Sequence, residues 1–109
     1  MFFSHKVTVA LLTFNRSEYL KYSIEAILNQ SYEQFEFLII DNGSTDNTTS
    51  IILKYNDPRI KYIRLPLGGN SAVSFFNAIK LSQGKYILIT HDDDILEKDL
   101  LKKQILHKF

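Results

Sequence analysis

Short apolar runs alternate with amphipathic segments along the whole chain. Four of these runs are rich in β-branched or aromatic residues and end in polar turns, which predicts strands at 7–12, 35–40, 60–65 and 85–90. The first two are apolar almost throughout, as expected of strands covered on both faces. The third alternates apolar and basic residues, which predicts a half-exposed strand at the edge of a sheet.

The segments between the first three runs predict two helices. Asn15 and Glu18 can form a capping box, and apolar residues then recur with helical spacing over about twelve residues. A second helix is expected to stop before Pro58. Its apolar residues are Ile51, Ile52 and Tyr55.

Two further helices are predicted in the second half of the chain. One starts at about Ser71, with Gly84 placed to close it in the left-handed conformation. Its inward residues are expected to be Ala72, Phe75, Phe76 and Ile79. The last helix is amphipathic and runs through Leu100, Leu101, Ile105 and Leu106.

The regular alternation of strands and helices predicts one α/β domain over residues 1–109, with a Rossmann-like parallel sheet and helices on both faces. We expect the strands in the order 3-2-1-4. Ligands bind such sheets beyond the carboxyl ends of the strands, at the point where the strand order reverses. The residues that follow the strands are therefore the candidates for function.

Composition narrows the classes of protein that fit. Hydrophobic residues make up 45% of the 109 residues and charged residues 23%, which argues against a disordered chain, a collagen or a coiled coil. A net charge of +1 argues against nucleic acid as a partner. Because the sequence has no cysteine, disulfide scaffolds, thiolate zinc sites and cysteine nucleophiles are excluded. The opening residues show no export signal, which favours a cytoplasmic location.

Polar residues follow each predicted strand, at 13–16, 41–46, 66–70 and 91–94. Because the carboxyl ends of parallel strands meet at one edge of the sheet, we expect Asp41 and Asp93 on the same edge, converging on one ligand.

The strongest chemical signal is the run Asp92-Asp93-Asp94. Adjacent carboxylates stay ionised at little cost only when a cation or many donors lie nearby, and hard oxygen ligands suit Mg²⁺ or Mn²⁺. The alternative is that these acids favour the positive start of the following helix, with Asp94 or a neighbour as its cap.

Asp41 is the second candidate, at the end of the second strand. An acidic residue at this position can accept a hydrogen bond from a bound base or ribose. The alternative is a turn aspartate that binds its own backbone. Together with the carboxylate run, Asp41 favours a nucleoside diphosphate held in a single cleft.

Three stretches carry motifs that occur together in one enzyme family. Val9–Arg16 ends a strand in Thr-x-Asn, Ile39–Asp46 contains an Asp-Asx-Gly-Ser-x-Asp turn, and Gly84–Asp94 ends in an Asp-x-Asp type metal motif. The sequence resembles the amino-terminal half of inverting family-2 glycosyltransferases over nearly its whole length. The resemblance implies a GT-A type nucleotide-diphospho-sugar transferase fold that is truncated after the donor-binding half.

The same resemblance implies roles for single residues. Thr13 and Asn15 would line the nucleoside pocket, and Asp41 would accept from the uracil imide. Asp92 would lie by the ribose or sugar, and Asp93 would hold the Mn²⁺ or Mg²⁺ ion that bridges the diphosphate. The donor would be a UDP-sugar, and the acceptor a saccharide or lipid-linked saccharide of cell-surface polysaccharide synthesis.

The sequence also departs from the family pattern. His91 stands where the family often has the first Asp of its metal motif, so its role as metal ligand or hydrogen-bonded strand-end residue stays open. Phe75 and Phe76 occupy the region of a common nucleotide-binding Arg and are expected in the core. The family's general base comes from a later segment, so no catalytic residue is assigned and the isolated chain is expected to be inactive.

Three other readings compete with this one. A Rossmann dehydrogenase needs a Gly-rich turn after the first strand, and residues 13–16 contain no glycine. A phosphoacceptor receiver domain, as that family is known, has acids after its first and third strands, whereas these strands end in Leu12-Thr13 and Leu65-Pro66. The third reading is a non-catalytic nucleotide-sugar-binding or interaction module.

Two expectations concern association. Uncovered apolar sheet surface should make the chain dimerise or aggregate, and membrane association is expected only through regions outside this sequence.

Overall fold

A four-stranded parallel sheet forms the centre of the computed structural model, which describes residues 7–66 and 71–108. Its strands run in the order β3-β2-β1-β4, as predicted. Their bounds are β1 (Val7–Thr13), β2 (Phe35–Asp41), β3 (Ile60–Arg64) and β4 (Tyr86–His91). The register aligns Thr13 with Asp41 and Leu12 with His91, so the carboxyl ends of β1, β2 and β4 lie level.

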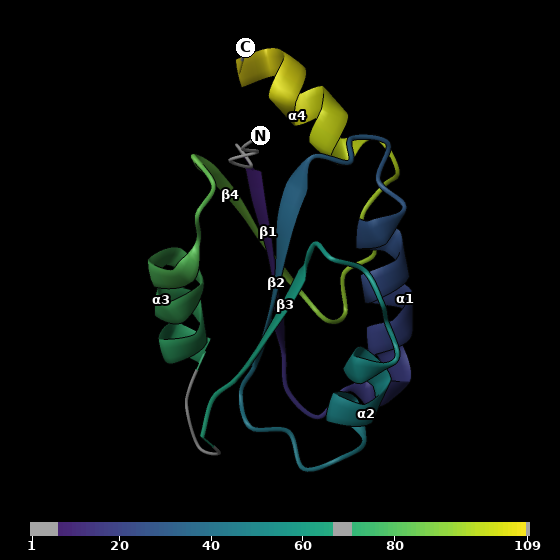
Figure 1. The fold of residues 1–109 in the computed structure, drawn as a ribbon, viewed down its shortest axis with the longest axis vertical. Coiled ribbons are helices and arrows are strands. Elements are labelled where there is room, and N and C mark those ends of the chain that lie inside the picture. Colours follow the sequence, from purple (N-terminus) through teal and green to yellow (C-terminus); the bar gives the residue numbers. More distant parts are fainter. Residues whose placement is uncertain (1–6, 67–70, 109) are drawn as a thin grey trace.

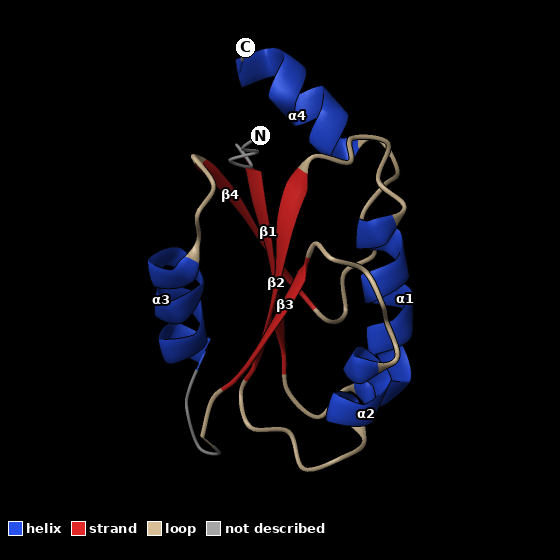
Figure 2. Ribbon diagram, viewed as in Figure 1, coloured by secondary structure: helices blue, strands red, loops and turns tan. Residues whose placement is uncertain are grey.

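Helices cover both faces of this sheet. The bounds are α1 (Ser17–Leu28), α2 (Thr48–Leu53), α3 (Ser71–Leu81) and α4 (Leu100–Lys108). Helices α1 and α2 lie on one face and α3 lies on the other, while α4 lies near the amino ends of the strands (Figure 1). Figure 2 shows the same layers, with the strands between the two sets of helices.

The two central strands explain the uninterrupted apolar pattern. Every residue of β1 and β2 is buried, because α1 covers one side and α3 the other. The larger core packs α1 and α2 against one face, and the smaller core packs Ala78 of α3 against the other. Residues of the edge strand β3 are half-buried or exposed, which confirms the predicted edge strand.

A buried carboxylate ties the amino-terminal half of the sheet together. Glu36 is 1% exposed, and it accepts hydrogen bonds from Thr8 Oγ1 at 2.8 Å, Lys61 Nζ at 2.7 Å and the Gln83 amide at 2.9 Å. Burial acts to raise the pKa of Glu36, but the bonds from Lys61, Gln83 and Thr8 outweigh it and leave the pKa below its ordinary value. Glu36 therefore joins β1, β2, β3 and the turn after α3.

The predicted capping box of α1 is wrong. The helix begins at Ser17 after Arg16, without a side-chain cap from its N-cap residue. Asn15 instead lies in the left-handed region at φ 49°, and its side chain binds a loop far along the sequence. A local pattern cannot show that a distant backbone competes for the Asn15 oxygen.

The predicted role of Gly84 is also wrong, since Gly43 is the described glycine with positive φ, at 82°. Gly84 is required by close approach to β1. A Cβ atom at this position would lie 2.5 Å from Thr8 Oγ1 and 2.6 Å from the Thr8 amide nitrogen. The Gly84 amide donates to Thr8 Oγ1 at 2.9 Å.

The orientation of α3 differs most from the prediction. Ser74 and Ala78 face the sheet, whereas Phe75, Phe76 and Ile79 are 48%, 65% and 50% exposed. Ala72 is exposed as well. Small residues on the inner side let the helix lie close to the sheet, which turns the large apolar residues outward.

The end of α2 differs from the prediction, whereas α4 agrees with it. Tyr55 lies beyond the end of α2, where its hydroxyl donates to Glu25 of α1 at 3.1 Å. In α4, Leu101 is buried as predicted, while the side chain of Leu106 lies outside the described part of the structure.

Candidate functional site

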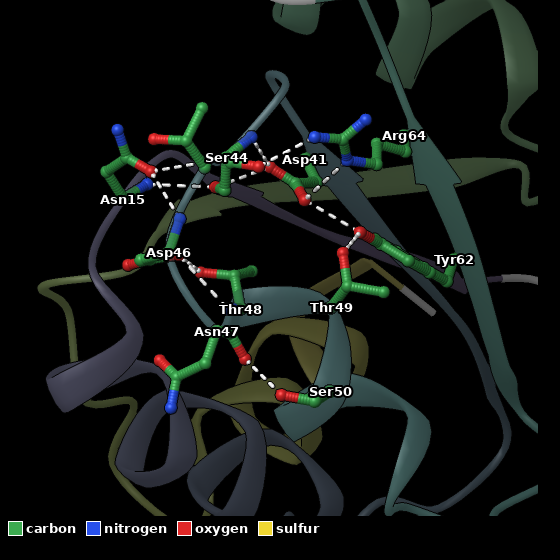
Figure 3. Close-up of polar contacts among 11 residues, drawn as sticks. Asn15, Asp41, Ser44, Asp46, Asn47, Thr48, Thr49, Ser50, Tyr62 and Arg64 are labelled. Carbon is green, nitrogen blue, oxygen red and sulfur yellow. Dashed lines mark hydrogen bonds and ion pairs between the residues drawn. The ribbon is translucent and has the colours of Figure 1, made fainter.

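The loop after β2 is closed by hydrogen bonds to its own first residue. Asp41 is fully buried at the end of the strand, and its Oδ1 accepts from the Ser44 amide at 2.9 Å and the Ser44 hydroxyl at 2.6 Å. Its Oδ2 accepts from the Tyr62 hydroxyl at 2.7 Å and lies 3.9 Å from Arg64 Nε (Figure 3). Both carboxylate oxygens of Asp41 are thus engaged within the protein.

Edge-strand residues complete this cluster. Arg64 Nη2 donates to the Ser44 carbonyl at 2.7 Å, and the Tyr62 hydroxyl also bonds Thr49 at 2.8 Å. Burial, together with the Asp41 carboxylate, raises the pKa of Tyr62 above its ordinary value, despite the opposing effect of Thr49. The end of β3 therefore holds the loop of β2 in place.

Asn15 links the end of β1 to the same loop. Its amide donates to Ser44 Oγ at 2.9 Å, and its side-chain oxygen accepts from the amides of Thr45 at 2.8 Å and Asp46 at 3.4 Å (Figure 3). Asp46 in turn accepts from the Ser17 amide at the start of α1 at 3.2 Å. Sequence reasoning placed Asn15 in a nucleoside pocket, and the structure shows its side chain holding two loops together.

The loop after β4 contains one buried and two exposed carboxylates. Asp92 is 7% exposed, and its Oδ2 accepts from Thr13 Oγ1 at 2.8 Å and from the Phe14 amide at 3.2 Å. Its Oδ1 lies 3.7 Å from Arg16 Nε. Asp93 and Asp94 are exposed. Thr13 and Asp92, which were predicted in the site from separate motifs, are in direct contact.

The helix-capping alternative for these acids is wrong. Helix α4 starts at Leu100, well beyond Asp94, so the acids do not lie in its first turn. The loop is instead held by its backbone. The Asp92 and Asp94 carbonyls accept from the Ser23 hydroxyl of α1 at 2.8 and 3.2 Å. The exposed carboxylates of Asp93 and Asp94 are therefore not explained by helix capping.

Two cavities meet at Asp92. The first, which we call the β1–β4 cleft, has a volume of about 290 Å³ and lies at the carboxyl ends of β1 and β4. Its lining consists of Leu12, Thr13, Phe14, Arg16, Asn42, Ser74, His91 and Asp92. The second, the α1 cavity, has a volume of about 560 Å³. It is lined by Arg16, Tyr19, Tyr22, Glu25, Asp92, Asp93 and Ile95.

The predicted site residues do not all line the same cavity. Thr13 and Asp92 line the β1–β4 cleft, whereas Asp93 lines the adjoining α1 cavity. Asp41 and Asp93 follow the same edge of the sheet, as predicted, but Asp41 lines neither cavity. Its neighbour Asn42 does line the cleft. Residues 67–70 of the predicted third loop lie outside the described residues.

Sequence reasoning missed Arg16, Asn42 and Ser74 as lining residues. Arg16 and Asn42 were both inside the motifs, so their place at strand ends was the available signal. Ser74 gave no such signal, because it faces the cleft only through the unexpected orientation of α3.

The side chains available as metal ligands can be compared with what a divalent metal requires. Within residues 7–66 and 71–108, no three His, Cys, Asp or Glu side chains are grouped so that they could hold an ion by themselves. Mg²⁺ and similar ions that bridge nucleotide phosphates need only one or two protein carboxylates, because phosphate and water supply the rest. The exposed Asp93, which lines the α1 cavity together with Asp92, fits that requirement.

Comparison with known proteins identifies the family. Residues 8–107 match the family described as glycosyl transferase family 2. The chain belongs to this family. It is 33% identical over 101 residues to the Bacillus subtilis "putative teichuronic acid biosynthesis glycosyltransferase TuaG", covering 91% of this chain and 40% of the relative. It is 30% identical over 99 residues to an Escherichia coli enzyme, with 91% of this chain and 39% of the relative covered. That enzyme is the "UDP-Glc:alpha-D-GlcNAc-diphosphoundecaprenol beta-1,3-glucosyltransferase WfgD".

Solved structures agree with the fold of this family member. The chain superposes on S. aureus TarS in complex with UDP-GlcNAc with a TM-score of 0.86 and 28% identity, covering 93% of this chain and 30% of that one. A Pyrobaculum calidifontis mannosyltransferase, in complex with GDP-Man and Mn²⁺, superposes with a TM-score of 0.85 at 22% identity, which supports the fold alone. This match covers 92% of the chain and 31% of the mannosyltransferase. The sheet order and these matches confirm the predicted GT-A type fold.

The chain spans about 40% of the length of the curated relatives named above. Within the described residues, no helix is long and apolar enough to cross a membrane.

Proposed function

We propose that this chain binds the donor of a metal-dependent, inverting glycosyltransferase that transfers a sugar from a UDP-sugar to an acceptor hydroxyl. The observation that supports this most is the contact between Thr13 and Asp92 at the junction of two cavities, with the exposed Asp93 beside it. One cavity can take the nucleoside and the other the sugar, while the acids lie where the diphosphate would pass.

The nucleoside would lie in the cleft between the ends of β1, β2 and β4. Asp41 was predicted to accept from the base, but its carboxylate already binds Ser44 and Tyr62. Asn42 lines the cleft, and its side-chain amide can donate an N–H bond to a carbonyl of a base such as uracil. We therefore propose that Asn42 contacts the base and that Asp41 holds the loop on which Asn42 lies.

The diphosphate would lie near Arg16, Asp92 and Asp93. Arg16 contributes a half-exposed guanidinium that lines both cavities. Asp93, with Oδ1 of Asp92, would hold Mn²⁺ or Mg²⁺. When bound, such an ion supplies positive charge that stabilises the leaving nucleotide. The Thr13 hydroxyl and the Phe14 amide both donate to Oδ2 of Asp92, while Oδ1 lies 3.7 Å from Arg16 Nε.

The relatives support the choice of donor. TarS is solved with UDP-GlcNAc, and the Escherichia coli relative is named for UDP-Glc and a lipid-linked acceptor. A UDP-sugar donor and a saccharide or lipid-linked acceptor are therefore proposed for the reaction to which this chain would contribute donor binding. No described residue is assigned as the general base. A cytoplasmic location, a homodimer and an inactive isolated chain stay predictions.

Isothermal titration of the chain with UDP tests the proposal. We expect saturable binding that is at least tenfold weaker without Mn²⁺ and in Asp93→Asn. Asp94→Asn removes a neighbouring exposed carboxylate that lines neither cavity and serves as the matched control. Absence of UDP binding with Mn²⁺ present would overturn the proposal. Sugar transfer by the isolated chain would show that it also holds a base.

A further inference from the structure

Helix α3 presents its largest apolar side chains to the outside. Phe76 is 65% exposed, Ile79 50% and Phe75 48%, while the small residues Ser74 and Ala78 face the sheet. Ile79 lies three residues after Phe76 and four after Phe75, so these side chains share one side of the helix, which we call the α3 outer face. A stripe of this size and exposure indicates contact with something other than water.

The surroundings of this stripe are positively charged. The segment from 71 to 85 contains no Asp or Glu, and its charged residues are Lys80 and Lys85, which are both exposed. Among the described residues, neither Lys80 nor Lys85 forms a salt bridge, whereas Lys61 pairs with Glu36. An apolar stripe with Lys80 in the last turn of the same helix, and no acidic residue in the segment, matches the surface of a bilayer that contains anionic lipids.

Nothing in the described part of the chain covers this face. Helix α3 lies alone on its side of the sheet, opposite α1 and α2 (Figure 1). A second copy is the main competitor for the face. A helix of 11 residues is only about 16 Å long, whereas a stable dimer commonly needs about 800 Å² from each partner. The stripe is too small for that, but it is large enough for shallow insertion among lipid headgroups.

We propose that the α3 outer face docks on anionic lipid bilayers, with Phe76 and Ile79 in the interface and Lys80 near the headgroups. This docking uses residues outside both cavities, so it stands independently of donor binding. It also differs from the expectation that membrane association would come only from regions outside this sequence.

Sedimentation with lipid vesicles tests the proposal. We expect the chain to bind vesicles of phosphatidylcholine mixed with phosphatidylglycerol more tightly than vesicles of phosphatidylcholine alone. The double variant Phe76→Ser/Ile79→Ser should lose about tenfold or more in partitioning on both. Lys80→Gln should lose about fivefold on the anionic vesicles and nothing on the neutral ones.

Leu53→Ser is the matched control, because Leu53 is 69% exposed on α2, on the opposite face, and should partition as the wild type does. Circular dichroism checks that each variant is folded, and Lys80→Gln keeps the test open if the double variant is not. Wild-type protein that stays in the supernatant would overturn the proposal. Equal losses in Leu53→Ser would also overturn it, as would a dimer in solution that the double variant abolishes.

Discussion

Two acidic loops flank the end of β1, and they differ in how far their carboxylates are buried and hydrogen-bonded. After β2, Asp41 is buried with both oxygens bonded to Ser44 and Tyr62, and the loop is closed around it. After β4, Asp92 is anchored by Thr13, while Asp93 and Asp94 are exposed. A carboxylate with both oxygens bonded inside the protein, such as Asp41, stabilises its loop. Exposed carboxylates next to an anchored one, such as Asp93, are available to bind a ligand.

The largest expected effect is on the closed loop. Asp41→Ala should lower the free energy of unfolding by about 3 kcal/mol, because it leaves the Ser44 amide and the Tyr62 hydroxyl without their acceptor. Asp93→Ala, at an exposed position, should change it by less than about 0.5 kcal/mol. Urea denaturation of both variants measures the difference. Similar losses in the two proteins would remove the distinction between the loops.

Glu36 is a second buried carboxylate that is bonded inside the protein, at the other end of the sheet. Glu36→Gln should cost about 2 kcal/mol near neutral pH, because Lys61 loses its charged partner.

The effect of Glu36 should depend on pH. Its pKa is lowered in the folded protein from an ordinary value of 4.5, so the folded state favours the charged form. This stabilisation is fully present above the pKa that Glu36 has in the unfolded protein. It is lost as the pH falls through the lower pKa that Glu36 has in the folded protein. Urea denaturation from neutral to acidic pH should therefore show the difference between wild type and Glu36→Gln shrinking below about pH 4.5. A gap that stays constant in acid would contradict the assignment.

A smaller effect than that of Asp41→Ala is expected at Asn15, which joins the loop after β2 to the end of β1. Asn15→Ala should cost about 2 kcal/mol, since it removes the acceptor for Thr45 and places alanine at φ 49°. Asn15→Gly loses the same acceptor without the backbone strain and should cost about 1 kcal/mol. Thermal unfolding of the two variants separates the terms. A glycine variant less stable than the alanine variant would show that the left-handed backbone is not the source of strain.

The fold was predictable because its signals are local or repeated. The apolar runs of β1 and β2 mark strands buried on both faces, and their alternation with helices fixed the sheet order that the structure confirms. The orientation of α3 was not predictable from its sequence alone. Apolar residues occur around most of the helix, so the side that faces the sheet depends on whether small Ser74 and Ala78 allow close contact.

The candidate site was predictable as a set of strand ends but not as a set of contacts. The motifs brought Thr13 and Asp92 to the same edge, and the structure places them 2.8 Å apart. The roles of Asn15 and Asp41 depend on Thr45, Ser44 and Tyr62, which bind them across loops. Such partners are a matter of tertiary structure, so a linear motif cannot distinguish a ligand-binding Asp from one that holds a loop.

The proposal that the loop after β4 binds a metal and a nucleotide is tested most directly by melting temperatures. These are measured for wild type and Asp93→Asn, with and without UDP plus Mn²⁺. A ligand at about a hundred times its dissociation constant adds roughly 2.7 kcal/mol of stability, so the wild type should melt several degrees higher with both present. Asp93→Asn should lose that gain and, without ligand, should melt at or slightly above the wild-type temperature, because it removes one of the adjacent like charges. Equal wild-type melting temperatures with and without UDP and Mn²⁺ would contradict donor binding by the chain. A gain in Asp93→Asn as large as in the wild type would contradict the proposed role of the Asp93 carboxylate.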